Sequence, residues 1–372
     1  MKWQVAVLPG DGIGPEVIDA AVVVLQATAK RFGHEADLRF HDVGWAAYEG
    51  HGVPLPNATL EGCKGADAVL LGAVGDPRGD ALDPELRPEA ALLALRQEMG
   101  CFANLRPVRL VPALADASPL RRERVEGTDL VIVRELAGGV YYAGPRGRDA
   151  DGQGAVDTMR YSRGEIVRIA KVAFETARGR RKQVLSVDKA NVLHSSRLWR
   201  EVVDGVAEAY PDVTCTHMLV DRAAMELVLG PSRLDVMLTS NLFGDILSDE
   251  AAAVVGSIGL LASASIGGGG GIFEPVHGSA PDIAGTGTAN PLATILSVAL
   301  LLRHVYGHEA EATAIEAAVE RVLGAGLRTP DLARGRERTV GTEAVARAVA
   351  EAVALTEADA GAETTVPRTS HA

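Results

Sequence analysis

The stretch Met237–Glu250, MLTSNLFGDILSDE, contains the pattern around which the rest of the chain is organised. The preceding residues join it in a short apolar run, Leu234–Thr239, which is rich in β-forming residues and predicts a buried strand. Ser240 or Asn241 can then cap a helix that continues through Ala251. The sequence therefore predicts a buried strand that leads directly into a helix.

Two acidic residues, Asp245 and Asp249, lie four positions apart and therefore on one face of this helix. Like charges at that spacing destabilise a helix by about 0.2–0.5 kcal/mol unless something neutralises them. Mg²⁺ or Mn²⁺ would do so, because these cations prefer carboxylate oxygens. Alternatively, the two residues only complement the helix dipole. The pair alone leaves both interpretations open.

The overall composition is that of a soluble globular protein large enough for more than one domain. The chain has 372 residues, of which 47% are hydrophobic and 23% charged. Its net charge of −12 argues against binding to nucleic acid or to an anionic membrane. Three scattered cysteines without a CxxC pair indicate a reducing compartment, and we expect the cytoplasm.

Two segments could be taken for a signal peptide or a membrane span. The N-terminal MKWQVAVLPG reaches a turn too soon for a signal peptide. Residues Ala251–Phe273 contain no charged residue, but Gly256, Gly259 and the run Gly267–Gly271 interrupt them. We interpret this segment as a buried helix followed by a mobile loop, not as a membrane span.

The remaining chain alternates predicted strands and helices, which indicates a largely parallel sheet covered on both faces. The glycines of Pro9–Glu16, PGDGIGPE, are spaced GxGxG and followed by proline. The Rossmann fingerprint requires GxGxxG, so we reject it. Ser162 and Glu165 form a predicted capping box. We expect strands near residues 3–8, 36–43, 66–71, 102–110, 129–135, 183–187 and 213–220, an exposed arm at 144–154, and a disordered tail at 356–372.

Several residue types point to chemistry at the ends of these elements. Arg96, Arg106 and Arg134 could be carboxylate clamps, because the guanidinium fork matches a carboxylate, or ordinary surface charges. Lys189 follows a strand and could be a general base or a solvated lysine. Tyr141 could donate a proton or pack as an aromatic residue.

Two further residues have a functional and an ordinary interpretation. Asp221 could be a third metal carboxylate or a plain acid at a helix start. His277 lies among small residues that would let an adenine or a ribose approach the backbone.

Six motifs in order carry a family resemblance: GDGIGPE from residue 10, FANLRP from 102, VRELAGGVY from 133, SVDKANVL from 186, NLFGDILSD from 241 and FEPVHGSAPDIAG from 273. Over Gln4–Leu355 the chain resembles the β-decarboxylating dehydrogenases, the isocitrate and isopropylmalate dehydrogenases. The resemblance implies a two-domain α/β fold that is not a Rossmann fold. Residues 1–101 plus 256–355 would form the cofactor-side domain, and 102–255 the domain for dimerisation and for metal and substrate binding.

The resemblance also implies roles for particular residues. Tyr141 and Lys189 would be the catalytic acid and base, in a homodimer whose active sites are shared through Lys189 and Asp221. The metal, Mg²⁺ or Mn²⁺, would be bound by Asp221, Asp245 and Asp249. The substrate would be bound by Leu92, Leu93, Arg96, Arg106, Arg134 and Asn191. NAD would be bound by Glu274, His277, Gly278, Ala280, Asp282, Ile283 and Asn290.

The helix start at Leu86–Leu93 indicates which substrate to expect. The isocitrate branch of the family has serine and asparagine there, whereas Leu92 and Leu93 offer an alkyl surface. This surface favours the isopropyl group of 3-isopropylmalate, oxidised and decarboxylated to 2-oxoisocaproate in leucine biosynthesis. Pockets that differ by a methylene discriminate by only about 1–3 kcal/mol, so tartrate-, malate- or homoisocitrate-type substrates stay open.

Two alternatives come from other functional classes. A catalytically inactive regulatory homologue would be expected to lack Lys189, Tyr141 or an aspartate, and the sequence has all of them. A metal phosphohydrolase is disfavoured by the arginine set and by the missing P-loop. Aspartate and isoleucine at 282–283, where the NADP-using branch has lysine and tyrosine, favour NAD over NADP.

Overall fold

A single ten-stranded sheet forms the centre of the computed structural model, which describes residues 1–355. The expected disordered tail, 356–372, lies outside the described residues. The strand order is β2-β1-β3-β12-β11-β4-β5-β10-β8-β9. The strands are β1 (Lys2–Gly10), β2 (Glu35–Phe40), β3 (Ala68–Ala73), β4 (Cys101–Arg109), β5 (Asp129–Glu135), β8 (Gln183–Asp188), β9 (Thr214–Leu219), β10 (Val236–Thr239), β11 (Ala262–Gly267) and β12 (Gly271–Pro275).

The sheet consists of two parallel blocks joined by an antiparallel centre. Strands β2, β1, β3 and β12 pair in parallel, as do β5, β10, β8 and β9. The pairs β12–β11, β11–β4 and β4–β5 are antiparallel. The predicted mostly parallel α/β architecture is confirmed. The division into domains 1–101 plus 256–355 and 102–255 stays a prediction.

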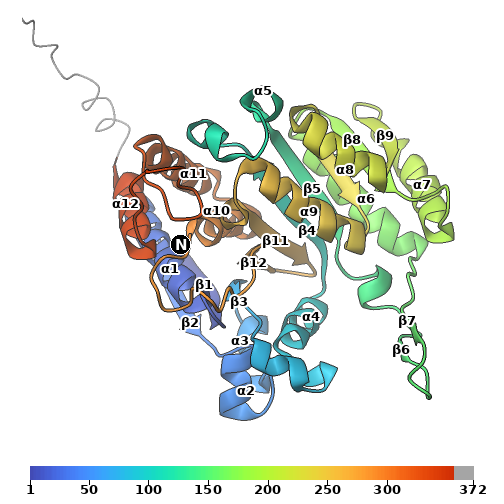
Figure 1. Cartoon of the computed structure of the whole chain (residues 1–372), viewed down its shortest axis with the longest axis horizontal. Helices are drawn as coiled ribbons and strands as arrows, with labels where there is room; N and C mark the ends of the chain where they lie inside the picture. Colours follow the sequence, from blue (N-terminus) through green and yellow to red (C-terminus); the bar gives the residue numbers. More distant parts are fainter. Residues whose placement is uncertain (356–372) are drawn as a thin grey trace, which may run out of the picture.

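Helices cover both blocks, as parallel strands require. Figure 1 shows α1, α10, α11 and α12 together at one end of the molecule and α6, α7 and α8 at the other. Arg31 at the end of α1 donates to the Val353 carbonyl (2.7 Å), which joins the first and last helices. The helices are α1 (Gly14–Phe32), α2 (Trp45–His51), α3 (Asn57–Lys64), α4 (Pro88–Glu98), α5 (Arg122–Val125), α6 (Arg163–Arg178), α7 (His194–Ala207), α8 (Val220–Leu229), α9 (Asn241–Val255), α10 (Leu292–Tyr306), α11 (Glu309–Gly324) and α12 (Thr342–Ala354).

The expectation of a buried helix followed by a mobile loop over Ala251–Phe273 is wrong in its second half. Helix α9 ends at Val255, and the chain then forms the β11–β12 hairpin in the middle of the sheet. Ser263 and Ser265 are buried there, and Asn104 of β4 satisfies both hydroxyls by donating to them (2.7 and 3.0 Å). Within residues 1–355, no helix is long and apolar enough to cross a membrane.

The predicted strand-to-helix unit is confirmed as β10 followed by α9, but its cap differs from the expectation. Ser240 occupies the N-cap position, yet its hydroxyl is buried and has no hydrogen-bond partner in the described structure. The Asn241 side chain also caps nothing; its contacts lie in the site below. By contrast, the capping box of Ser162 and Glu165 at α6 is present as predicted.

The GDGIGPE motif ties several distant segments together. The Asp11 carboxylate accepts backbone N–H groups from Trp45 (2.9 Å) and Ala46 (3.0 Å), which begin α2, and from Gly75 (2.9 Å) after β3. Gly12 has a positive φ of 57°, and a Cβ there would collide with the Ser279 carbonyl. That carbonyl accepts the Ile13 N–H at 2.8 Å. The motif therefore fixes the loop after β12 against the start of α1.

A second carboxylate continues this connection. Glu16 on α1 accepts the backbone N–H groups of Gly285 and Gly287. The loop is thus held at Ser279 and again at residues 285–287. The intervening residues 280–284 are therefore anchored on both sides to the start of α1.

Replacing Asp11 with alanine should lower the free energy of unfolding by about 2–4 kcal/mol, because it removes a helix cap and leaves buried N–H groups unpaired. Asp19→Ala is the control, since Asp19 is exposed on α1. Chemical denaturation of both variants measures the difference. Equal stability of the two variants would contradict the role of Asp11.

Candidate active site

The centre of the candidate site is an ion pair between Arg134 and Asp245. Arg134 is the next-to-last residue of β5 and is 2% exposed. Asp245 lies on α9, which follows the neighbouring parallel strand β10. One guanidinium nitrogen of Arg134 contacts Asp245 Oδ1 directly. The Nε and Nη2 atoms donate to Asn241 Oδ1 at 3.0 and 2.7 Å. Burial lowers the pKa of Arg134, and the Asp245 charge opposes this effect.

Tyr141 forms a further hydrogen bond with Asp245. Its hydroxyl donates to Asp245 Oδ2 at 2.7 Å. Burial, and then this hydrogen bond and charge, raise the pKa of Tyr141 to about 12. The phenol therefore keeps its proton at neutral pH. Gly139, two residues earlier, has a positive φ of 76°, and a Cβ there would collide with the Tyr161 hydroxyl.

Arg106 connects Asp245 with Asp249. It is 5% exposed on β4, and its Nε donates to Asn104 Oδ1 at 2.8 Å. Its guanidinium nitrogens lie 3.5 Å from Asp249 Oδ1 and 3.7 Å from Asp245 Oδ1, and one donates to Ser248 Oγ. Burial and the neighbouring Arg134 charge lower the pKa of Arg106 to about 10.

The two aspartates have opposite pKa shifts. Burial raises the pKa of Asp245, but Arg134 and the other positive neighbours outweigh it, so the net pKa falls. Burial raises the pKa of Asp249, the Arg106 charge only partly opposes this, and the charge of Asp245 adds to it. Two carboxylates that repel each other and offer only oxygen donors fit a hard divalent cation.

Arg96 connects the predicted substrate-binding residues with the predicted cofactor-binding loop. Its Nη2 donates to Glu274 Oε1 at 2.6 Å, and both side chains are buried. Burial would lower the pKa of Arg96, but the Glu274 carboxylate outweighs it and the pKa is raised. Leu92 and Leu93, on the same helix α4, are partly exposed, and Leu92 packs on the core beneath.

Lys189 and Asp221 are not part of this cluster within one chain. Lys189 follows β8 and forms an ion pair with Asp221 at the start of α8. Neither side chain contacts Asp245 or Asp249 through a hydrogen bond or ion pair among residues 1–355. Asn191 is exposed in the same loop.

The loop after β12 has features that suit a nucleotide. His277 places Nδ1 2.9 Å from the Gly278 carbonyl oxygen, while its Nε2 is buried and unpartnered in the described structure. Burial lowers the pKa of His277, so the ring is neutral at neutral pH. Gly278 and Asp282 are exposed, and Ala280 adopts a positive φ of 39°. An orphaned nitrogen beside an exposed glycine fits a bound polar ligand.

Two other predicted cofactor residues have structural partners. Ile283 packs against the small cluster of Ile13, Val17 and Ala289. Asn290 accepts the Leu292 N–H at 3.0 Å and donates to Asp331 at 2.9 Å. Their side chains therefore shape the loop whether or not they touch a ligand.

Sequence reasoning missed three polar residues that hold the site arginines, namely Asn104, Asn241 and Ser248. Asn241 also donates to the carbonyls of Leu136 (3.3 Å) and Gly138 (3.0 Å), so it joins the turn after β5 to α9. Each lies close in sequence to a predicted site residue. Asn104 comes two residues before Arg106, Ser248 one residue before Asp249, and Asn241 four residues before Asp245. That proximity was the available signal.

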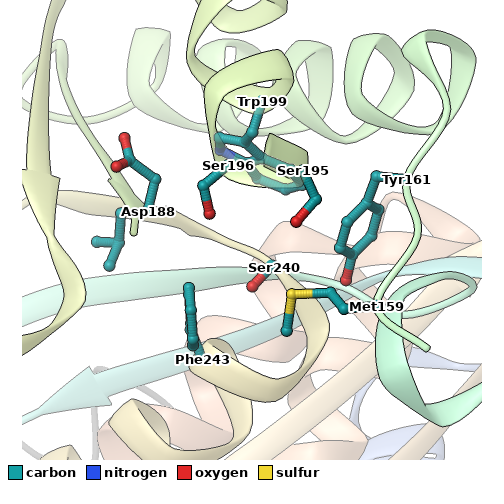
Figure 2. A pocket seen from close by; sticks show the side chains of 9 residues that line it. Met159, Tyr161, Asp188, Ser195, Ser196, Trp199, Ser240 and Phe243 are labelled. Atoms are coloured by element: carbon teal, nitrogen blue, oxygen red, sulfur yellow. The ribbon is translucent and has the colours of Figure 1, made fainter. Parts of the chain in front are cut away.

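Figure 2 shows a small cavity on which the side chains of Ser195, Ser196 and Ser240 converge beside Trp199. Its volume is about 10 Å³, which suits one water molecule at most. It is too small for a substrate. Because Ser196 Oγ accepts the Lys189 N–H at 3.1 Å, the cavity lies directly behind the Lys189 loop.

Comparison with known proteins shows the family to which the chain belongs. The model of the isocitrate/isopropylmalate dehydrogenase family matches residues 4–349. Proteins named 3-isopropylmalate dehydrogenase are 55% identical (Halalkalibacterium halodurans) and 53% identical (Bacillus subtilis); each alignment covers 95% of this chain and 98% of the relative. The crystal structure of isocitrate dehydrogenase from Methylococcus capsulatus gives a TM-score of 0.85 at 38% identity, covering 95% and 100% of the two chains. The chain belongs to the isocitrate/isopropylmalate dehydrogenase family.

Proposed function

We propose that this protein oxidises and decarboxylates 3-isopropylmalate to 2-oxoisocaproate with NAD, as a step of leucine biosynthesis. The observation that carries the proposal is the convergence of Arg106 and Arg134 on the carboxylates of Asp245 and Asp249, with the charge of Arg96 near enough to act on Asp245. The names of the relatives at 53–55% identity support the substrate. The partly exposed alkyl surface of Leu92 and Leu93 supports it as well.

The arginines supply the binding of a dicarboxylate. Each guanidinium is buried and already oriented by a protein partner, so little conformational freedom is lost when a carboxylate binds. Leu92 and Leu93 would contact the alkyl substituent. Asn191 would reach the substrate from the Lys189 loop.

Asp245 and Asp249 would hold the divalent cation, with Asp221 as a third ligand. A bound Mg²⁺ or Mn²⁺ supplies Lewis-acid polarisation of the substrate oxygens, and bound NAD accepts the hydride. Lys189 would remove the proton of the substrate hydroxyl. Tyr141 would return a proton to the carbon that has lost CO₂, and its raised pKa keeps that proton available.

The placement of Lys189 and Asp221 supports a homodimer with shared sites. Both lie outside the cluster of their own chain, beside an exposed apolar surface on α8 and α9. This surface comprises Met225 (53% exposed), Val228 (38%), Leu229 (42%) and Ile246 (59%). Exposed apolar patches of this kind mark association surfaces. A second copy docked there would bring its Lys189 and Asp221 toward this site.

We place the enzyme in the cytoplasm, because its cysteines are free thiols.

Steady-state kinetics tests the function directly. With Mg²⁺ or Mn²⁺ and NAD⁺, NADH should form from 3-isopropylmalate with a higher kcat/KM than from isocitrate, malate or tartrate. A chelator should abolish turnover. A higher kcat/KM for another of these acids would identify that acid as the substrate in place of 3-isopropylmalate. Absence of turnover with all of them would overturn the enzyme assignment.

Mixing two inactive variants tests the shared site. Lys189→Met should lower kcat by roughly 10²–10⁴-fold, as expected for a lost general base, and Asp245→Asn should abolish metal-dependent turnover. In a heterodimer of the two, one site combines intact Asp245 with intact Lys189 from the partner. Activity should therefore return in part after subunit exchange. Exchange shown by mass spectrometry without recovered activity would contradict a shared site.

Cofactor choice gives an independent prediction. Asp282 is exposed, and a carboxylate facing the adenosine ribose accepts its hydroxyls and repels a 2′-phosphate. The double variant Asp282→Lys, Ile283→Tyr should lower kcat/KM for NAD and raise it for NADP. Ile283→Val is the control, because it alters the packing on Ile13 without altering charge. A preference of the unmodified enzyme for NADP would refute this assignment.

A further inference from the structure

A second cluster of metal-ligand side chains lies outside the candidate active site. His34 lies in the turn between α1 and β2, His308 in the turn between α10 and α11, and Glu311 in the first turn of α11. One donor atom of each residue lies within 4.8 Å of the other two. The three side chains are only 13%, 20% and 10% exposed, respectively. Their burial distinguishes them from ordinary surface charges.

Hydrogen bonding accounts for only part of this cluster. His34 Nε2 lies 2.8 Å from Glu311 Oε1, which is a normal hydrogen bond. His308 Nδ1 lies 3.6 Å from the same oxygen, which is too long for one. Its Nε2 is buried and has no partner among residues 1–355. His308 is therefore a half-buried imidazole oriented toward a carboxylate that it does not reach.

Aromatic packing fixes the two imidazole rings. The His308 ring centre lies 4.7 Å from that of His34, 5.8 Å from Trp3 and 5.8 Å from Tyr306. The Tyr306 hydroxyl is in turn anchored to Asp67 Oδ2 at 2.9 Å. Rings held in this way lose little freedom when they bind an ion, so the cluster is pre-organised.

We propose that His34, His308 and Glu311 form a binding site for a divalent transition-metal ion of the zinc type. Two imidazole nitrogens and one carboxylate oxygen are a donor set typical of Zn²⁺. In a tetrahedral site with bonds of about 2.1 Å, donor atoms lie roughly 3.4 Å apart. The distances of 2.8 and 3.6 Å to Glu311 bracket this value, so small side-chain rotations complete the site.

The ion would act as a structural cross-link rather than in catalysis. His34 follows the first helix of the chain, whereas His308 and Glu311 begin the penultimate helix. A metal bound by all three would connect segments up to 277 positions apart in sequence. The site requires neither substrate nor NAD and is independent of the proposed reaction.

Cobalt binding to the full-length protein in excess Mg²⁺ tests the proposal. Mg²⁺ prefers oxygen donors and occupies the carboxylate site of Asp245 and Asp249, leaving the histidine site for Co²⁺. The unmodified protein should bind one Co²⁺ with the strong visible absorption of a four-coordinate ion. His308→Gln should weaken this binding by more than roughly 100-fold, since loss of a direct ligand exceeds the loss of an outer partner.

The matched control is His51→Gln. His51 Nε2 also lies 3.6 Å from a carboxylate, that of Asp42, but has no third ligand beside it. This variant should bind Co²⁺ like the unmodified protein. Glu311→Gln provides a second test should His308→Gln fail to fold, and Mg²⁺-dependent turnover should be unchanged in every folded variant. No four-coordinate spectrum in the unmodified protein, or an undiminished one in folded His308→Gln or Glu311→Gln, would overturn the proposal.

Discussion

The buried charge of Arg134 is the constraint on which the rest of the site depends. Removing a guanidinium from water costs several kcal/mol unless its donors are satisfied and its charge is balanced. Asn241 and Asp245, both on α9, provide these partners. The side-chain NH₂ of Asn241 also donates to the carbonyls of Leu136 and Gly138. These hydrogen bonds hold β5, the turn after it and α9 together. Asp245 balances this charge with one carboxylate oxygen and accepts the Tyr141 hydroxyl with the other.

Much of the fold was predictable because its signals are local. The apolar run before Ser240 and the capping box at Ser162 each lie within a single window of sequence, and both were confirmed. The β11–β12 hairpin was not predicted, because its small and hydroxyl-bearing residues resemble a loop. They form strands by pairing with β4 and β3, which come much earlier in the chain, and Asn104 of β4 satisfies the buried hydroxyls. Such long-range satisfaction leaves no local trace.

The same distinction applies to the site. Arg134 and Asp245 could be expected to meet, because the neighbouring parallel strands β5 and β10 present their carboxyl ends at one edge. Arg106 could not be placed by this rule, because β4 runs antiparallel to β5. The pairing of Arg96 with Glu274 joins residues 178 positions apart, and no spacing rule anticipates it. The pairing of Lys189 with Asp221 likewise depends on how β8 and α8 are arranged in space. The sequence thus predicts which residues lie at the site better than it predicts their partners.

The position of β12 between β3 and β11 has a consequence for the order in which the chain can fold during synthesis. Strand β3 is complete at Ala73, but its inner neighbour β12 ends only at Pro275. Until about 200 further residues have been made, β3 therefore presents an unpaired, wholly apolar edge. The second parallel block, β5, β10, β8 and β9, is finished earlier, at Thr239, and can assemble first. The first block to be translated is accordingly the last to close, and its nascent edge is the segment that most needs protection from aggregation.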